Sequence, residues 1–275
     1  MSFAGLRVLS LESRRANEME ILIRRHEGDP FVAPSVKELG LDRPEEAIRF
    51  VERLEAGEFD MVICMTGTGI AFLRDAVCPH MPLERLGATL RQTTIVSRGP
   101  KPVGILRTLG VPVQVMIPEP NTWKEIVSAV AERPERRIAV QEYGRPNAEL
   151  NAALEQLGAQ VSSIVLYRWE LPEDREPLRE AARRLAAGTV DVVLFTSSIQ
   201  LDHLLETARE LELEDAVRRA LAHETVIVSI GPVMTATLEA QGISPAIVPN
   251  HPKMASLVKA AADQALDLVR QKRDA

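Results

Sequence analysis

The chain has few cysteines and few aromatic residues, and each shortage excludes a class of protein. Its 275 residues include only two cysteines, Cys64 and Cys78. They form no CxxC pair and indicate neither a zinc site nor a disulfide framework. This cysteine usage is typical of a reducing compartment, so we predict a cytoplasmic protein. Aromatic residues make up 4% of the chain, too few for the stacking platforms that bind single-stranded nucleic acid.

Basic blocks and membrane-length segments are lacking as well. The chain has 33 Lys and Arg against 39 Asp and Glu, a net charge of −6 at pH 7, which disfavours generic nucleic-acid binding. No apolar run approaches the roughly 18–20 residues of a membrane span. The first residues carry no signal-peptide pattern. We therefore expect neither nucleic acid nor a membrane as a partner.

What the chain does contain is an internal repeat. A length of 275 residues suits one large domain or two of ordinary size. Segments of the first half recur in the same order in the second half, at a period of about 131 residues. We interpret the chain as a duplication, which favours two domains. The recurring segments are Arg15, Asn17 and Gly28 (as Arg145, Asn147 and Gly158), Leu54–Asp60 (as Leu185–Asp191) and Ile95–Pro100 (as Ile227–Pro232).

Short apolar runs alternate with amphipathic stretches in each half. Continuous apolar runs such as Met61–Met65 and Val192–Thr196 are typical of parallel strands covered on both faces. Helices between them form right-handed crossovers. We predict an α/β protein with two doubly wound parallel-sheet domains, of the flavodoxin or Rossmann type. Further strands are predicted at Leu6–Leu11, Thr94–Ser97, Val113–Ile117, Ile138–Gln141, Val226–Ile230 and Ala246–Val248.

Two segments interrupt this rhythm. Phe31–Glu38 and Val161–Glu170 alternate apolar and polar residues and occupy equivalent places in the two repeats. Such alternation is typical of a half-exposed strand. We predict that each leaves its sheet to form a linker between the domains.

Four turns that lead from a strand into a helix consist largely of small and hydroxyl residues. Open parallel sheets bind their ligands at such turns, beyond the carboxyl ends of the strands. Backbone N–H groups at helix N-termini hold anions. For any single turn, helix capping is the alternative role, but four paired turns together predict a cleft for a polyanion. The basic residues among them either meet ligand carboxylates or lie solvated at the surface. The predicted binding residues are Thr66, Gly67, Thr68, Ser97, Arg98, Gly99, Lys101, Thr196, Ser197, Ser198, Gly231 and Thr235.

Other chemistries have little support. The sequence has no phosphate-loop or GxGxxG motif and no GxSxG motif. Its five histidines lack metal-ligand spacing. Cys64 lies in an apolar strand and is interpreted as a core residue. Taken alone, Tyr167 in the second alternating segment is interpreted as half-buried packing.

The order of these features resembles the uroporphyrinogen-III synthase family. Val192–Ser198 (VVLFTSS) is similar to the family's strand ending in F-T/S-S. Ile230–Gly242 is similar to its I-G-x…L-x-x-x-G turn and helix. Val165–Arg168 (VLYR) is similar to its tyrosine-bearing linker strand. The resemblance covers essentially the whole chain.

The resemblance implies interleaved domains, one from 1–35 with 172–275 and the other from 41–160. The linker strands, about 31–40 and 161–171, would form a two-stranded ladder. The implied activity is that of a hydro-lyase, which cyclises hydroxymethylbilane to uroporphyrinogen III with inversion of the last pyrrole ring and loss of water. The family uses no metal or cofactor. Its ligand is a polycarboxylate tetrapyrrole, and Tyr167 would assist departure of the hydroxyl as a hydrogen-bond donor.

Two residues depart from the family pattern. Met234 stands where the family usually has threonine, with Thr235 one residue later, and Pro102 follows Lys101 at an equivalent place. Proline also removes a backbone donor. Two further functions therefore remain open: a non-catalytic module that senses a tetrapyrrole or another anion, and a different two-domain protein that binds a small metabolite. Nothing in the sequence compels association, and we expect a monomer.

Overall fold

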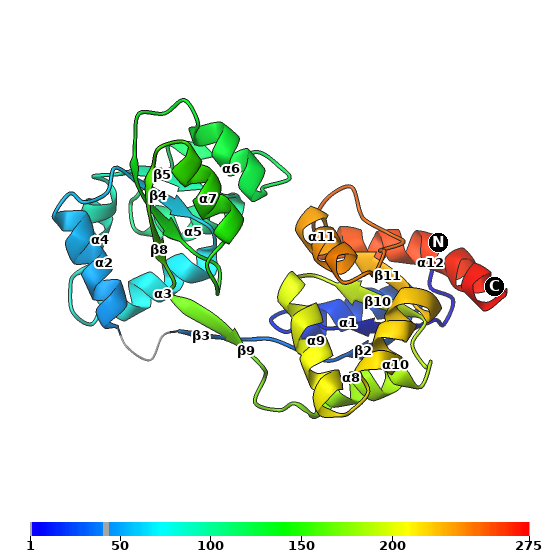
Figure 1. The fold of residues 1–275 in the computed structure, drawn as a ribbon. Helices are drawn as coiled ribbons and strands as arrows, with labels where there is room; N and C mark the ends of the chain where they lie inside the picture. The colour runs from blue at the N-terminus through cyan, green and yellow to red at the C-terminus, as the bar shows by residue number, and fades with distance from the viewer. Residues whose placement is uncertain (1, 41–43, 275) are drawn as a thin grey trace. The chain divides into compact units, whose positions relative to one another are not determined.

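The computed structural model describes residues 2–40 and 44–274. The expected domain start at residue 41 and the two chain ends lie outside the described residues. The chain forms two compact units (Figure 1). Unit 1 consists of Met1–Lys37 and Glu170–Ala275, and unit 2 of Glu38–Trp169. Unit 1 is therefore assembled from both ends of the chain.

Unit 2 contains a five-stranded parallel sheet in the order β6-β5-β4-β7-β8. Alternate residues of the central strand enter opposite cores. Val62 and Cys64 pack with the helices α2 to α5, whereas Met61 and Ile63 pack with α6 and α7. This two-sided burial explains why the strand is apolar throughout. The strands are β4 Met61–Cys64, β5 Thr94–Ser97, β6 Val115–Met116, β7 Arg137–Gln141 and β8 Gln160–Ile164, and the helices are α2 Glu45–Glu55, α3 Gly67–Val77, α4 Leu83–Leu90, α5 Pro100–Thr108, α6 Trp123–Val130 and α7 Ala148–Gln156.

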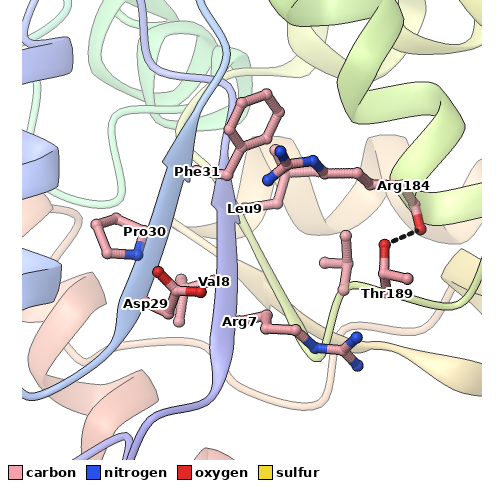
Figure 2. A pocket seen from close by; sticks show the side chains of 9 residues that line it. Arg7, Val8, Leu9, Asp29, Pro30, Phe31, Arg184 and Thr189 are labelled. Carbon is pink, nitrogen blue, oxygen red and sulfur yellow. Dashed lines mark hydrogen bonds between the residues drawn. The ribbon is translucent and has the colours of Figure 1, made fainter.

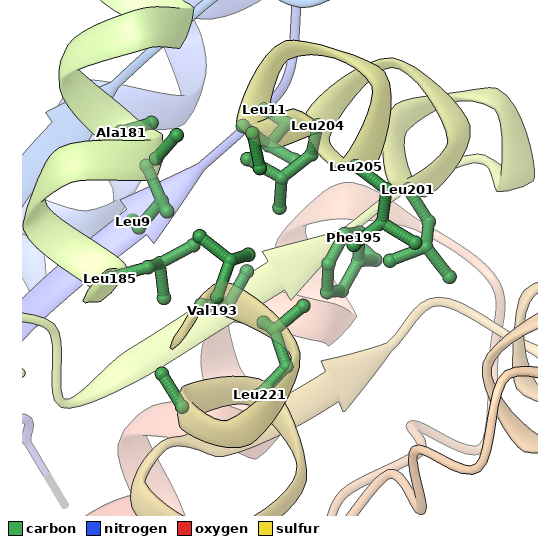
Figure 3. Close-up of a cluster of buried hydrophobic side chains, with 14 of the residues drawn as sticks. Leu9, Leu11, Ala181, Leu185, Val193, Phe195, Leu201, Leu204, Leu205 and Leu221 are labelled. Atoms are coloured by element: carbon green, nitrogen blue, oxygen red, sulfur yellow. The ribbon is translucent and has the colours of Figure 1, made fainter. Parts of the chain in front are cut away.

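Unit 1 contains a four-stranded parallel sheet in the order β11-β10-β1-β2. Val193 and Phe195 of its central strand β10 pack with α8 to α11, and Figure 3 shows this core. Val192 and Leu194 pack with α1 and α12 on the other face. The strands are β1 Arg7–Ser10, β2 Asp29–Val32, β10 Val192–Phe195 and β11 Val226–Ser229, and the helices are α1 Ala16–Arg25, α8 Glu176–Ala186, α9 Ser198–Glu210, α10 Glu214–Arg219, the π-helical turn Ala220–Glu224, α11 Pro232–Ala240 and α12 Met254–Asp274.

A separate two-stranded antiparallel sheet pairs β3 (Lys37–Gly40) with β9 (Tyr167–Glu170). The predicted fold class, two doubly wound parallel-sheet domains with a two-stranded ladder, is confirmed. Each predicted linker strand is nevertheless divided into two. In the first, Pro34 lies between β2 and β3, and proline cannot donate to a sheet ladder. In the second, β8 completes the sheet of unit 2 before β9 begins.

The internal repeat is visible as repeated contacts. Arg7 at the start of β1 pairs with Asp191, with 2.8 Å between Nη2 and Oδ1, and its side chain also donates to the Gly188 carbonyl at 3.4 Å. Arg137 at the start of β7 pairs with Asp60 in the same way. Each pair joins one residue from the first repeat to one from the second. Both sheets therefore combine strands from the two repeats.

Two predicted strands are shorter than expected. Within the predicted Val113–Ile117, only Val115–Met116 pairs as β6, and Ala246–Val248 contributes one bridge, between Ile247 and Val228. Prolines stand directly before and after both segments. Because proline lacks an N–H donor, the outer edge of each sheet is kept short.

Candidate functional site

Two pockets in the described part of the chain lie away from the predicted turns. In unit 1, a pocket of about 170 Å³ is lined by residues near the amino ends of the strands, such as Arg7 and Asp29. Figure 2 shows Arg184 across the ring of Phe31 there, with its guanidinium 3.9 Å from the ring centroid. The pocket of unit 2, about 250 Å³, includes the equivalent Arg53. Ligands of parallel sheets bind at the opposite ends of the strands, so neither pocket is the candidate site.

The turn after β4 begins the candidate site of unit 2. Thr66 is the N-cap of α3, and its hydroxyl oxygen accepts from the Gly69 amide at 3.0 Å. A Cβ atom on Gly67 would lie 2.7 Å from the Lys101 carbonyl oxygen. Glycine is therefore required where the N-termini of α3 and α5 meet. The predicted residues Thr66, Gly67 and Lys101 come together here, beside the half-buried Thr68.

Tyr167 lies beside this turn, and its side chain is only 1% exposed. Its hydroxyl is 3.3 Å from the Thr66 hydroxyl. Its ring stacks on Phe72 at a centroid distance of 5.6 Å and meets Trp169 edge-on at 6.1 Å. The hydroxyl is thus held next to a second hydroxyl by rings on two sides.

The turn after β5 places a cation in the same region. The Ser97 hydroxyl is buried and donates to the Gly99 carbonyl at 2.7 Å, which shapes the turn. The Arg98 guanidinium lies 5.1 Å from the ring centroid of Tyr143, and among the described residues no carboxylate pairs with it. Burial lowers the pKa of Arg98, and its interactions with Tyr143 and Tyr167 oppose that shift. The site therefore contains a half-buried, partly desolvated cation that has no carboxylate partner in the part of the chain that the structure describes.

The residues that follow β7 complete the site, and sequence reasoning missed them. Glu142 is fully buried, and one of its carboxyl oxygens accepts from Ser163 at 2.9 Å and Asn151 at 3.1 Å. The other oxygen has no partner among the described residues. Burial raises the pKa of Glu142. Burial likewise raises the pKa of Tyr143, and Arg98 opposes that shift. Their position directly after a predicted strand was the signal that could have found them.

In unit 1, the turn after β10 has its own polar network. The Thr196 hydroxyl donates to the Glu12 carboxylate at 2.6 Å. The Gln200 side-chain oxygen accepts from the amides of Thr196 and Ser197 at 2.8 and 3.2 Å. These amides therefore already have protein acceptors. Ser198 is the first residue of α9, and the amides of a first helical turn have no acceptor within the helix.

The turn after β11 lies beside the turn after β10, because Phe195 at the end of β10 pairs with Ser229 at the end of β11. Thr235 donates to the Ser229 hydroxyl at 2.9 Å, and Ser229 donates to the Gly231 carbonyl at 3.1 Å. Met234 is 1% exposed and packs in the core. The hydroxyl at this turn thus comes from Thr235, whereas Met234 faces away into the apolar interior.

Nucleophilic and metal chemistry find little support in the described residues. Cys64 is completely buried, and burial raises the pKa of its thiol to about 12. Within residues 2–40 and 44–274, no three His, Cys, Asp or Glu side chains gather as a metal site. None of the helices in that part of the chain is both long and apolar enough to span a membrane.

Known proteins resemble the chain over nearly its whole length. The family model described as uroporphyrinogen-III synthase HemD matches residues 17–259. An uncharacterized protein of Bacillus subtilis (strain 168), YjjA, is 25% identical over 258 residues, or 92% of this chain and 94% of that protein. A protein of Methanothermobacter thermautotrophicus, provisionally named a uroporphyrinogen-III synthase, is 28% identical over 252 residues, or 90% of this chain and 94% of its own length.

A solved structure agrees with these sequence matches. The crystal structure of a mutant uroporphyrinogen III synthase from the extremely thermophilic bacterium Thermus thermophilus aligns with 96% of this chain and 100% of its own, at a TM-score of 0.72 and 22% identity. At 22% identity, this structural similarity establishes the fold alone.

Proposed function

The chain belongs to the uroporphyrinogen-III synthase family, and from this premise we propose that it closes linear hydroxymethylbilane into uroporphyrinogen III. The reaction inverts the last pyrrole ring and releases water. The proposal makes the protein a lyase that acts without a metal or cofactor on a polycarboxylate tetrapyrrole.

One observation in unit 2 carries the proposal. The hydroxyls of Thr66 and Tyr167 lie 3.3 Å apart, near the half-buried guanidinium of Arg98, which no described carboxylate neutralises. An unpaired charge that is partly removed from water is costly unless a counter-ion joins it. Guanidinium groups bind carboxylates through paired hydrogen bonds. A substrate with both a leaving hydroxyl and carboxylates therefore matches these groups.

In the proposed mechanism, Tyr167 donates its proton toward the hydroxymethyl oxygen, and the carbon–oxygen bond breaks to release water. The delocalised cation bonds to the last pyrrole ring at the α-carbon that already carries the chain. The older bond at that carbon then breaks and re-forms at the ring's free α-carbon, which inverts the ring, and the proton lost from that carbon restores the phenol. Positioned proton transfer of this kind contributes roughly 10²–10⁴-fold. The larger task is to hold the flexible chain in the conformation that gives the inverted ring. Because Tyr167 is 1% exposed, the side chains around it must move to admit the substrate.

We assign further carboxylate contacts to the predicted turns of both units. Arg98, Lys101 and the amides of Gly67 and Thr68 at the start of α3 supply donors in unit 2, with Ser97 and Gly99 shaping that edge. In unit 1, Thr196 already donates to Glu12. Thr235 likewise donates to Ser229. The contacts there fall to Ser197, Ser198 and Gly231, and to Thr196 and Thr235 where they exchange these hydrogen bonds for a ligand carboxylate.

The test is the isomer formed from hydroxymethylbilane. Purified protein should yield the type III isomer, whereas the uncatalysed reaction closes the ring without inversion and gives type I. Formation of type I alone, at the uncatalysed rate, would contradict the proposal.

Two observations favour a second candidate, a module that binds a tetrapyrrole without converting it. Met234 is buried in the core, and Pro102 is buried in the first turn of α5. Both positions lack the hydroxyl that is usual in the family. Such a module would bind uroporphyrinogen III tightly and yield no type III isomer from hydroxymethylbilane. A synthase would release the product readily.

A further inference from the structure

In each unit a glutamine side chain connects the turn before a helix to the end of the neighbouring strand. In unit 1 this glutamine belongs to the helix, whereas in unit 2 it belongs to the strand. Thr66 and Ser197 are the equivalent N-caps of α3 and α9. Three residues later, α9 carries Gln200 and α3 carries Gly69. On the neighbouring strand it is unit 2, not unit 1, that carries the glutamine. Leu11 follows β1 in unit 1, and Gln141 ends β7 at the equivalent place in unit 2.

In unit 1, Gln200 completes a capping box, in which the third helical residue accepts from the N-cap amide. Its Oε1 accepts from the Ser197 amide at 3.2 Å, and its Nε2 donates to the Leu11 carbonyl at 3.1 Å. A single side chain thus fixes the turn to the adjacent strand.

In unit 2, Gln141 does the same from the strand. Its Oε1 accepts from the Thr66 amide at 3.2 Å, and its Nε2 donates to the Glu142 carbonyl. A Cβ atom on Gly69 would lie 1.8 Å from Gln141 Nε2. Because both side chains cannot occupy this space, a glutamine on the strand requires glycine on the helix. The side chain of Gln141 is 1% exposed, so its bonds are made without competing water.

We propose that Gln141 is a positioning residue, which holds the Thr66 turn so that the Thr66 hydroxyl faces Tyr167. The inference rests on the proposed function for its kinetic readout. Its structural part, the hold on the Thr66 amide, is independent of that function. Gln141 itself touches no reacting atom in the proposed mechanism. Its loss would act through the 3.3 Å contact between Thr66 and Tyr167.

The test transplants the unit 1 arrangement into unit 2. Gln141→Leu should lower kcat about tenfold with a smaller change in KM, since one well-placed hydrogen bond contributes about that factor. It should also speed hydrogen exchange at the Thr66 amide. The double variant Gln141→Leu/Gly69→Gln should restore both kcat and amide protection, because the glutamine introduced on α3 would then occupy the place that Gln200 has in unit 1.

A matched control distinguishes the hydrogen bonds of the glutamine amide from the packing of the side chain. Gln141→Leu/Gly69→Met fills similar space without an amide. It should regain any melting temperature that Gln141→Leu loses, but neither kcat nor the protection of the Thr66 amide. Gln156→Leu, on the exposed end of α7, should change nothing. Equal rescue by methionine and glutamine at position 69 would overturn the proposal, and so would unchanged exchange at Thr66 in Gln141→Leu. If the parent protein makes no type III isomer, the proposed function fails, and the exchange data alone still decide the role of Gln141.

Discussion

Arg98 has opposing effects on stability and on binding. Its guanidinium is desolvated beside Tyr143, and desolvating an unpaired charge weakens the folded state. The same unpaired charge attracts a ligand carboxylate. A residue that lowers the stability of the ligand-free protein is thus the one expected to hold the substrate.

Arg98→Gln should therefore raise KM and stabilise the ligand-free protein. The loss of a charge-assisted hydrogen bond, about 1.5–3 kcal/mol, corresponds to a KM increase of roughly 10- to 100-fold. Steady-state kinetics and thermal unfolding measure the two effects. Arg107→Gln, on the exposed side of α5, is the control and should alter neither quantity. A lower melting temperature in Arg98→Gln would show that Arg98 is structural.

Tyr167→Phe separates the role of the phenol hydroxyl from that of the ring. Stacking on Phe72 and the contact with Trp169 persist in the variant, whereas the hydroxyl pair with Thr66 is lost. We expect kcat to fall about 100-fold and the free energy of unfolding to fall by only about 1 kcal/mol. Turnover and urea unfolding check this, and a large loss of stability with normal turnover would assign Tyr167 to packing.

At the scale of elements, the connection from β7 to α7 contains a buried acid whose charge state affects stability. Glu142 is fully buried, with one carboxyl oxygen unpartnered among the described residues. In the unfolded chain it ionises near its ordinary pKa of 4.5, whereas in the folded protein burial raises that pKa. The stability contributed by the neutral carboxyl is therefore fully present below 4.5 and lost as the pH rises through the raised folded value.

Glu142→Gln should remove this dependence, because glutamine keeps the shape and stays neutral. Its free energy of unfolding relative to the parent should grow from near zero at about pH 4 toward a constant advantage at higher pH. Urea unfolding across that range measures the difference. Glu155→Gln, exposed on α7, should show no such trend, and a parallel pH profile for Glu142→Gln and the parent would refute the assignment.

The elements also show how far sequence reasoning reaches. The buried strands are predictable because neighbouring residues, such as Val62 and Ile63, face cores on opposite sides of the sheet, which forces continuous apolar runs. The polar residues at the strand ends are not predictable in the same way. The role of Gln141 depends on Gly69, which is distant in sequence and is recognisable as its partner only once the turn and the strand lie together. The position of Glu142 directly after β7 marks it as a candidate, but its sequence does not distinguish it from a surface acid until its burial is seen.

At the scale of the whole molecule, repetition and interleaving have different origins. The repeat is readable in the sequence, and the matching pairs Arg7–Asp191 and Arg137–Asp60 show it in the structure. The interleaving is not contained in the repeat. It follows from β7 pairing with β4 in unit 2, and from β1 pairing with β10 in unit 1.

This arrangement predicts which fragments fold. Residues 38–169 contain the complete five-stranded sheet and both of its cores, so this fragment should give dispersed amide resonances and a cooperative thermal transition. The first repeat alone, about residues 1–131, lacks β7 and β8 and leaves one edge of β4 unpaired. It should be unfolded or aggregated. A stable first repeat beside an unfolded 38–169 fragment would contradict the division into these units.

In the proposed function, the protein directs ring closure rather than merely binding a tetrapyrrole. The most direct measurement is the isomer composition of the porphyrinogen formed from hydroxymethylbilane as protein concentration rises, with the oxidised porphyrins separated by chromatography. We expect type III isomer to increase in proportion to the protein and to outcompete the type I isomer formed by spontaneous closure. Type I isomer alone, at a rate independent of the protein, would contradict it.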